Sequence, residues 1–240
     1  MPRRKKLPGE PRKVRSDAGC IIVTERDIQA LRWITEQYAA RLDQVQVLLT
    51  QLSTVEPHDG KLLSYPTVMG KIQKWVDAGY VEYERILAKG PGWVFMKRAG
   101  VKEIDYQGLY PARKPEWCKL KHVYAVNQVR LLAEHAYWHD ERAIKMDREA
   151  GSEKAIPDAE MWDEGDAEND PIAVEVQLSH LKADVFQKKL AKLIQFPDGY
   201  RRVRLYAPNE KIANAARRAR EKLDYSDQDK IEIFIYPLTL

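Results

Sequence analysis

Apolar residues recur at helical spacing in three segments of the first eighty residues. In the first segment, 24–40, Thr24 stands where a helix cap is expected, and Asp27 follows three positions later. A second apolar run covers 42–52, and a third begins after Ser64 and ends at Gly79. The pattern predicts three consecutive short helices.

The pattern then changes to that of β-strands. Segments 81–87 and 92–98 are rich in β-branched and aromatic residues, and the turn-forming residues Lys89, Gly90 and Pro91 separate them. Three helices followed by a β-hairpin is the order of elements in a winged helix-turn-helix. We therefore predict a winged-helix DNA-binding domain over residues 18–104.

The segment 105–117 loses periodicity, and its glycine and prolines indicate a linker. Beyond it, the pattern predicts a second domain, 118–240, in which helices and strands are mixed. The expected helices cover 122–136, 182–194 and 209–223, and the expected strands cover 141–147, 154–162, 171–178, 201–207 and the closing segment from Ile231. The fold class that follows is mixed α/β.

Composition narrows the class of protein. The chain has 240 residues, 44% hydrophobic and 32% charged, which suits two soluble domains. No stretch approaches the roughly 18 apolar residues of a membrane span, and no apolar segment follows the basic N-terminus as in a secretory signal. Two cysteines, Cys20 and Cys118, make neither a disulfide framework nor a zinc site. We expect a cytoplasmic protein without a membrane partner.

The net charge of +4 is unevenly distributed. Residues 1–15 contain seven basic side chains and only Glu10 as an acid, so the rest of the chain is slightly acidic. We interpret residues 1–17 as a disordered basic arm that contacts phosphates; a merely solubilising tail is the alternative. The residues expected to contact double-stranded DNA are Arg3, Arg4, Lys5 and Lys6 of the arm, Thr67, Lys71 and Lys74 of the third helix, and Lys89 at the hairpin tip.

A pair of acidic residues in the second domain suggests chemistry. Asp158 opens one predicted strand, and Glu175 and Gln177 share one face of the next, because alternate side chains of a strand point the same way. If the two strands pair, Asp158 and Glu175 converge as ligands for Mg²⁺ or Mn²⁺. The alternative is a solvated acidic edge, but a carboxylate between two valines favours a partner. His122 is interpreted as a helix-start residue bonded to nearby backbone.

In this region the chain resembles the PD-(D/E)xK nuclease superfamily, with Pro157 and Asp158 as the first half of the motif and residues 175–177 as the second. Within it, the chain is similar to the replication-relaxation family of plasmids and integrative elements, through the segments HVYAVNQVR (122–130), WHDER (138–142), the PDA-type strand and the AVEV-type strand. The resemblance implies an αβββαβ core, catalytic residues Asp158, Glu175 and Gln177, and metal ligands Asp158 and Glu175.

Gln177 stands where the superfamily has lysine, and glutamine supplies only neutral hydrogen bonds. The same EVQ, followed by Ser179, also resembles competence-associated nuclease-like proteins. We expect Lys182 or Lys188, on the next helix, to supply the missing charge. Glu141, expected at the start of the first strand, is the candidate for an additional catalytic carboxylate, with Glu134 as its substitute.

Three functions are consistent with these patterns. The first is a metal-dependent DNA nuclease or nickase that acts in replication, relaxation or transfer of a mobile element. The second is a catalytically inactive DNA-binding regulator that retains the nuclease fold, and the third is an adaptor that recruits other proteins. A second copy of the chain and replication or conjugation proteins are further candidate partners.

Overall fold

The computed structural model describes residues 22–53, 61–106, 109–132, 137–147, 155–163, 165, 170–195 and 199–236. Helices and strands are mixed along these residues, and the strands form two sheets, so the mixed α/β class predicted from the sequence is confirmed. The basic arm, including Arg3, Arg4, Lys5 and Lys6, and the substitute carboxylate Glu134 lie outside the described residues.

The three predicted N-terminal helices are present as α1 (Glu25–Glu36), α2 (Leu42–Gln51) and α3 (Tyr65–Asp77). The side chain of Thr24 accepts the Asp27 N–H and the Asp27 carboxylate accepts the Thr24 N–H, which is the reciprocal arrangement of a capping box. Ser64 caps α3, and Gly79 follows that helix at φ 74°, a left-handed conformation that suits glycine.

A small antiparallel sheet completes this part of the chain. The hairpin expected from the sequence is formed by β2 (Val81–Glu84) and β3 (Trp93–Met96), with Val81 opposite Met96. A third strand, β1 (Ala40–Arg41), pairs with β3 and gives the order β1-β3-β2. The first helix was expected to reach Ala40, but it ends at Glu36, and the chain turns through Tyr38 at φ 63° into β1.

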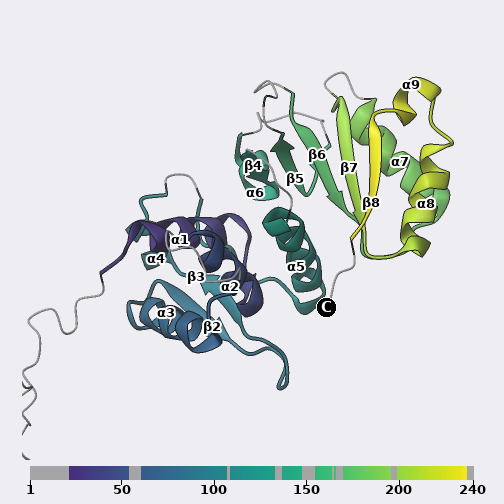
Figure 1. The fold of residues 1–240 in the computed structure, drawn as a ribbon. Coiled ribbons are helices and arrows are strands. Elements are labelled where there is room, and N and C mark those ends of the chain that lie inside the picture. The colour runs from purple at the N-terminus through teal and green to yellow at the C-terminus, as the bar shows by residue number, and fades with distance from the viewer. Residues whose placement is uncertain are drawn as a thin grey trace, which may run out of the picture.

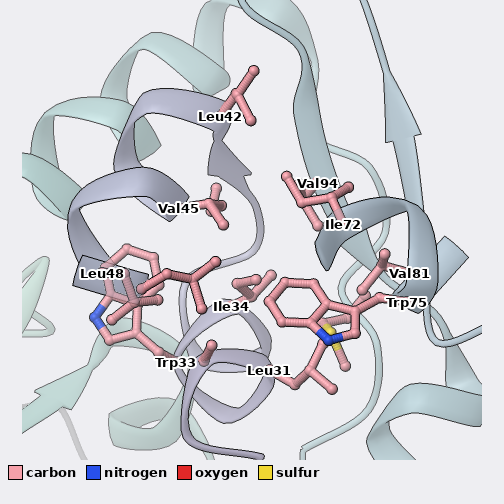
Figure 2. Packing of buried hydrophobic residues seen from close by; sticks show 14 of the residues in the cluster. Leu31, Trp33, Ile34, Leu42, Val45, Leu48, Ile72, Trp75, Val81 and Val94 are labelled. Atoms are coloured by element: carbon pink, nitrogen blue, oxygen red, sulfur yellow. The ribbon is translucent and has the colours of Figure 1, made fainter. Parts of the chain in front are cut away.

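The core of this part lies between the helices and the small sheet. The indole of Trp75, 1% exposed, lies close to Leu31 and Ile34 of α1 (Figure 2). Val81 and Val94 of the sheet belong to the same cluster, as do Val45 and Leu48 of α2. The apolar spacing seen in the sequence thus corresponds to the buried faces of all three helices. The short helix α4 (Arg98–Glu103) adds Val101 to the cluster.

The second part is a five-stranded mixed sheet with helices on both faces (Figure 1). Its strands are β4 (Tyr137–Asp140), β5 (Ala159–Trp162), β6 (Ile172–Val176), β7 (Arg202–Ala207) and β8 (Ile231–Ile235). They lie side by side in chain order; β4, β5 and β6 are antiparallel, and β6, β7 and β8 are parallel. The helices are α5 (Trp117–Leu132), α6 (Glu141–Asp147), α7 (Ala183–Ile194), α8 (Glu210–Arg220) and α9 (Tyr225–Gln228).

One predicted element of this part is wrong. Segment 141–147 was expected as a strand, but it forms the helix α6, and the first strand, β4, comes just before it. The reason is local: the Asp140 carboxylate accepts the backbone N–H groups of Arg142 and Ala143, at 2.8 and 3.2 Å, and so caps a new helix. Glu141 is therefore the first residue of a helix.

The helices cover opposite faces of the large sheet. Val174 and Val176 of β6 pack with α5, whereas Ala173, the residue between Ile172 and Val174, packs with α7 and α8. Adjacent residues of β6 thus face different layers, as the period of a strand requires. This alternation determines whether a polar side chain of β6 lies on the α5 face or on the α7 face of the sheet.

Helix α5 packs against both parts of the chain, and Figure 1 shows it between them. Leu120 and Tyr124 form a buried cluster with Trp93 and Phe95 of β3, while Ala125 and Val129 pack on the large sheet. Asn127, fully buried, donates to the Ala39 carbonyl at 2.8 Å. The helix at the start of the predicted second domain therefore completes the core of the first. None of the helices within the described part of the chain has the length and apolar character required to span a bilayer.

Candidate functional site

Strand β6 carries a buried acid toward helix α7. Because Val174 and Val176 face α5, Glu175 lies on the α7 side of the sheet, and it is only 3% exposed. Gln177 follows the strand and is also buried, and its backbone N–H donates to the Tyr206 carbonyl of β7 at 2.9 Å. An ionised carboxylate in such a position requires a charged or hydrogen-bonding partner.

Asp158 is fixed next to the end of β6 by backbone hydrogen bonds. It lies just before β5, and its N–H donates to the Val174 carbonyl at 3.0 Å. Its side-chain Oδ2 accepts the Val176 N–H at 2.7 Å. The antiparallel pairing of β5 with β6 therefore brings the carboxylates of Asp158 and Glu175 into one site, where the charge of Asp158 acts on Glu175.

A lysine from α7 enters this site. Lys189 Nζ lies 2.5 Å from Glu175 Oε2 and donates to Gln177 Oε1 at 3.4 Å. The sequence had suggested Lys182 or Lys188, but Lys182 precedes α7 as its exposed N-cap residue, and Lys188 is exposed. The structure corrects this assignment to Lys189. The signal was present in the helical spacing, because Lys189 is adjacent to the buried Leu190 and one turn after the buried Phe186.

A histidine from the opposite layer completes the site. His122 Nε2 lies 2.8 Å from Asp158 Oδ1. Helix α5 begins at Trp117, so His122 is in its second turn, and the expectation of a helix-start residue bonded to nearby backbone is wrong. Because His122 and Asp158 are far apart in sequence, no local pattern predicted this contact.

Each acid in the site is close to a positively charged or protonatable side chain, and the pKa values of Glu175, His122 and Lys189 are shifted by their neighbours. Burial, and then the charge of Asp158, raises the pKa of Glu175, while Lys189 opposes this shift. Burial lowers the pKa of His122, but the hydrogen bond and charge of Asp158 outweigh it, so the pKa is raised. The pKa of Lys189 is raised in the same way, because Glu175 outweighs burial. The site thus combines two carboxylates with two positively charged or protonatable groups.

The donor set suits a hard divalent cation only in part. Mg²⁺ is commonly bound by one or two carboxylates and several waters, and Asp158 and Glu175 are the residues that would hold it. Both Asp158 oxygens already accept hydrogen bonds, and Glu175 is paired with Lys189. Within the residues that the structure describes, no group of three or more His, Cys, Asp or Glu side chains is arranged as a metal cluster.

Glu141, the candidate additional carboxylate, lies on the wall of a cavity that also reaches Asp158. The cavity has a volume of about 430 Å³, and His122 and Asp140 line it as well. Glu141 Oε2 accepts a hydrogen bond from the Tyr38 hydroxyl at 3.0 Å, and Lys145 pairs with its other oxygen. Its carboxylate is therefore engaged by residues of both parts of the chain.

The residues expected to contact DNA differ in their availability. Thr67 and Lys74 of α3 and Lys89 between β2 and β3 are exposed. Lys71 is not free in the same way, since its Nζ pairs with the buried carboxylate of Asp27 at 2.9 Å. The exposed surface of α3 thus offers fewer cations than its sequence suggests.

Comparisons with known proteins identify no relative of this chain. No family model matches the sequence, and no match was found among the curated proteins or among the solved structures. The functional argument therefore depends on the contacts of the site itself.

Proposed function

We propose that the chain is a DNA-binding protein with a phosphodiester-cleaving site of the PD-(D/E)xK type. The observation that carries the proposal is the convergence of Asp158, Glu175 and Lys189. An acidic pair with a lysine is the set of groups that this chemistry needs, and here the lysine comes from α7 while Gln177 occupies its usual position.

The order of elements supports the same assignment. The series α5-β4-β5-β6-α7-β7 has the αβββαβ order of that superfamily if the short inserted helix α6 is set aside. The N-terminal series α1-β1-α2-α3-β2-β3, with sheet order β1-β3-β2, has the order of a winged helix. A winged helix presents its third helix to the major groove, and here that helix is α3, with Thr67 and Lys74 exposed.

The proposed chemistry assigns a task to each group. The Lys189 ammonium stabilises the charge that develops on a scissile phosphate with a full positive charge, whereas Gln177 supplies only neutral hydrogen bonds. Asp158 and Glu175 are the residues that would hold a divalent cation, and such a cation would supply activation of water and charge stabilisation at the phosphate. His122 orients Asp158 through the contact of 2.8 Å and is a positioning residue.

A nicking assay with matched variants tests the proposal. On supercoiled plasmid with Mg²⁺ or Mn²⁺, Asp158→Ala and Lys189→Met should each lower the nicking rate by roughly 100-fold or more, the scale for loss of one charge-stabilising group. Lys188→Met removes the neighbouring exposed lysine of the same helix and should leave the rate unchanged. Equal rates for the two lysine variants would contradict the role of Lys189.

One observation favours a second function, a DNA-binding regulator without catalysis. Both carboxylates already have cationic or protonatable partners within the chain, so the site is internally balanced without a metal. In that case the wild type binds plasmid DNA but nicks it with neither Mg²⁺ nor Mn²⁺.

The action on a mobile element, in replication, relaxation or transfer, is proposed from the motif resemblance. The test is to measure replication of a plasmid whose copy of this protein carries Asp158→Ala.

A further inference from the structure

A groove lies next to the carboxylate site and is lined by a different set of side chains. It has a volume of about 420 Å³, within the usual size of a small-ligand pocket. Lys121 and His122 of α5 and Lys189 of α7 line it, as do Gln177 and Ser179, which follow β6. No acidic side chain is among the described residues that line it. The groove therefore suits an anion.

An exposed tryptophan is among the side chains that line this groove. Trp117, the first residue of α5, is 40% exposed. The chain has six tryptophans, and four of the others are less than 9% exposed in the two cores: Trp33, Trp75, Trp93 and Trp138. A large indole left in contact with water beside a cationic groove indicates a ligand with a flat apolar face.

Lys121 combines with this aromatic surface. Its Nζ lies 5.9 Å from the centroid of the Trp117 ring, and it forms no ion pair with a carboxylate of the described residues. A cation beside an aromatic face is the combination that proteins use for a nucleotide, since the ring stacks on the base and the cation meets the phosphate. The groove continues to Lys189, the cation of the carboxylate site.

We propose that this groove binds an unpaired nucleotide of a DNA strand, with its base stacked on Trp117 and its phosphate between Lys121 and Lys189. The inference rests on the proposed function, whose substrate it defines as DNA with a single-stranded or unpaired segment at the cleavage position. A base within a duplex has both faces covered by its neighbours, so only an unpaired base is available for stacking.

The test compares two oligomers of equal charge, without metal. In EDTA, binding of a fluorescein-labelled eight-nucleotide oligothymidylate is measured against an abasic oligomer of the same length. Since both carry the same phosphates, the basic arm contributes equally to both. Wild type should prefer the thymidylate by roughly tenfold, the scale of one stacked base, and Trp117→Ala should abolish this preference.

Two further variants and a chemical readout complete the design. Trp117→Phe should retain most of the preference, and Tyr225→Ala, which removes an aromatic side chain 80% exposed on α9, should retain all of it. Cys118 lines the same groove and is a free, exposed thiol, so the thymidylate should slow its alkylation in the wild type. This second readout uses only the wild-type protein, so it does not depend on the folding of a variant.

The outcomes separate this inference from the proposed function. A wild type without preference for thymidylate, or a Trp117→Ala variant that keeps the preference, overturns the groove assignment. Absence of plasmid nicking together with a preference that depends on Trp117 overturns the nuclease proposal and leaves the nucleotide groove intact.

Discussion

Lys189 and His122 carry the cationic side of the site, and neither was assigned that role from the sequence. The positions of Asp158, Glu175 and Gln177 were recognisable because they lie within short strands whose alternation is fixed. Lys189 was missed in favour of Lys182 and Lys188, since helical rotation alone did not tell which lysine turns toward β6. His122 was missed because its contact with Asp158 crosses from one layer to another.

Asp140 is a second buried acid, and its titration predicts how stability depends on pH. It is 4% exposed, and burial, followed by the charge of Glu36, raises its pKa to about 6. Between about pH 4 and pH 6, the folded protein therefore keeps a proton on Asp140, whereas the unfolded chain, with an ordinary aspartate pKa near 4, has released it. The free energy of unfolding should fall as the pH rises from about 4 to 6, and stay lower above it.

The variant Asp140→Asn should remove this loss of stability. Its amide oxygen can still accept the Arg142 and Ala143 N–H groups, but it carries no charge. In urea unfolding at pH 8, the variant should be more stable than wild type by about 1–3 kcal/mol, since one pKa unit corresponds to about 1.4 kcal/mol. At pH 4.5 the difference should be much smaller.

The control for this prediction is Asp147→Asn, since the side chain of Asp147 is 71% exposed. It should have no comparable effect at either pH. A stability difference between Asp140→Asn and wild type that is the same at pH 4.5 and pH 8 would show that Asp140 is not the titrating group.

At the scale of elements, the short N-terminal helices depend on a single buried acid. Asp27 takes part in the capping box of α1, accepts the Trp75 indole N–H at 3.0 Å and pairs with Lys71 of α3. Burial raises the pKa of Asp27, but the hydrogen bonds from Thr24 and the ammonium of Lys71 outweigh it, so the pKa is lowered. One residue thus joins the start of α1 to the middle of α3.

Replacement of Asp27 should therefore cost more than loss of the cap. Asp27→Ala should lower the free energy of unfolding by about 3–5 kcal/mol, because it leaves the Lys71 ammonium and the Trp75 N–H without their partner. Thr24→Ala, which removes one capping side chain, should cost about 1 kcal/mol. Urea denaturation followed by circular dichroism measures both, with the exposed Glu25→Ala as the control. Equal losses for Asp27→Ala and Thr24→Ala would contradict the tertiary role of Asp27.

Most elements were predictable because their periodicity is local. The three N-terminal helices, the hairpin and the alternation of β6 follow from spacing alone. The strand expected at 141–147 failed because one side chain, Asp140, starts a helix there, and in a segment that short a cap decides more than the apolar pattern.

For the whole molecule, helix α5 makes the two parts depend on one another. The fully buried Gln44 of α2 donates to the Tyr124 carbonyl of α5 at 2.8 Å, and its side-chain oxygen accepts from Asn127 at 3.1 Å. Arg130 of α5 also pairs with Glu36 of α1 at 2.6 Å, while Ala125 and Val129 of α5 pack on the large sheet. The boundary at 105–117 was inferred from composition, and it divides the chain before the helix that both parts share.

A variant at this shared helix should disturb both sheets. Asn127→Ala removes the donor to the Ala39 carbonyl and to Gln44, and it should lower the free energy of unfolding by about 1–3 kcal/mol, the cost of unsatisfied buried polar groups. Amide hydrogen exchange should then accelerate in β3 and in β7 alike. The less buried neighbour Gln128→Ala serves as the control. Faster exchange confined to one sheet would mean that the two parts open independently.

The sequence by itself determined the mixed α/β class, the helical faces, the hairpin and the two acids beside adjacent strands. These features depend on residues close in sequence, where the periods of helix and strand act directly. The tertiary structure alone decided which cations meet those acids, that Lys189 of α7 lines the same groove as Trp117 of α5, and that α5 serves two cores. Such contacts join residues distant in the chain, and their geometry follows from how the layers pack on both faces of the sheet.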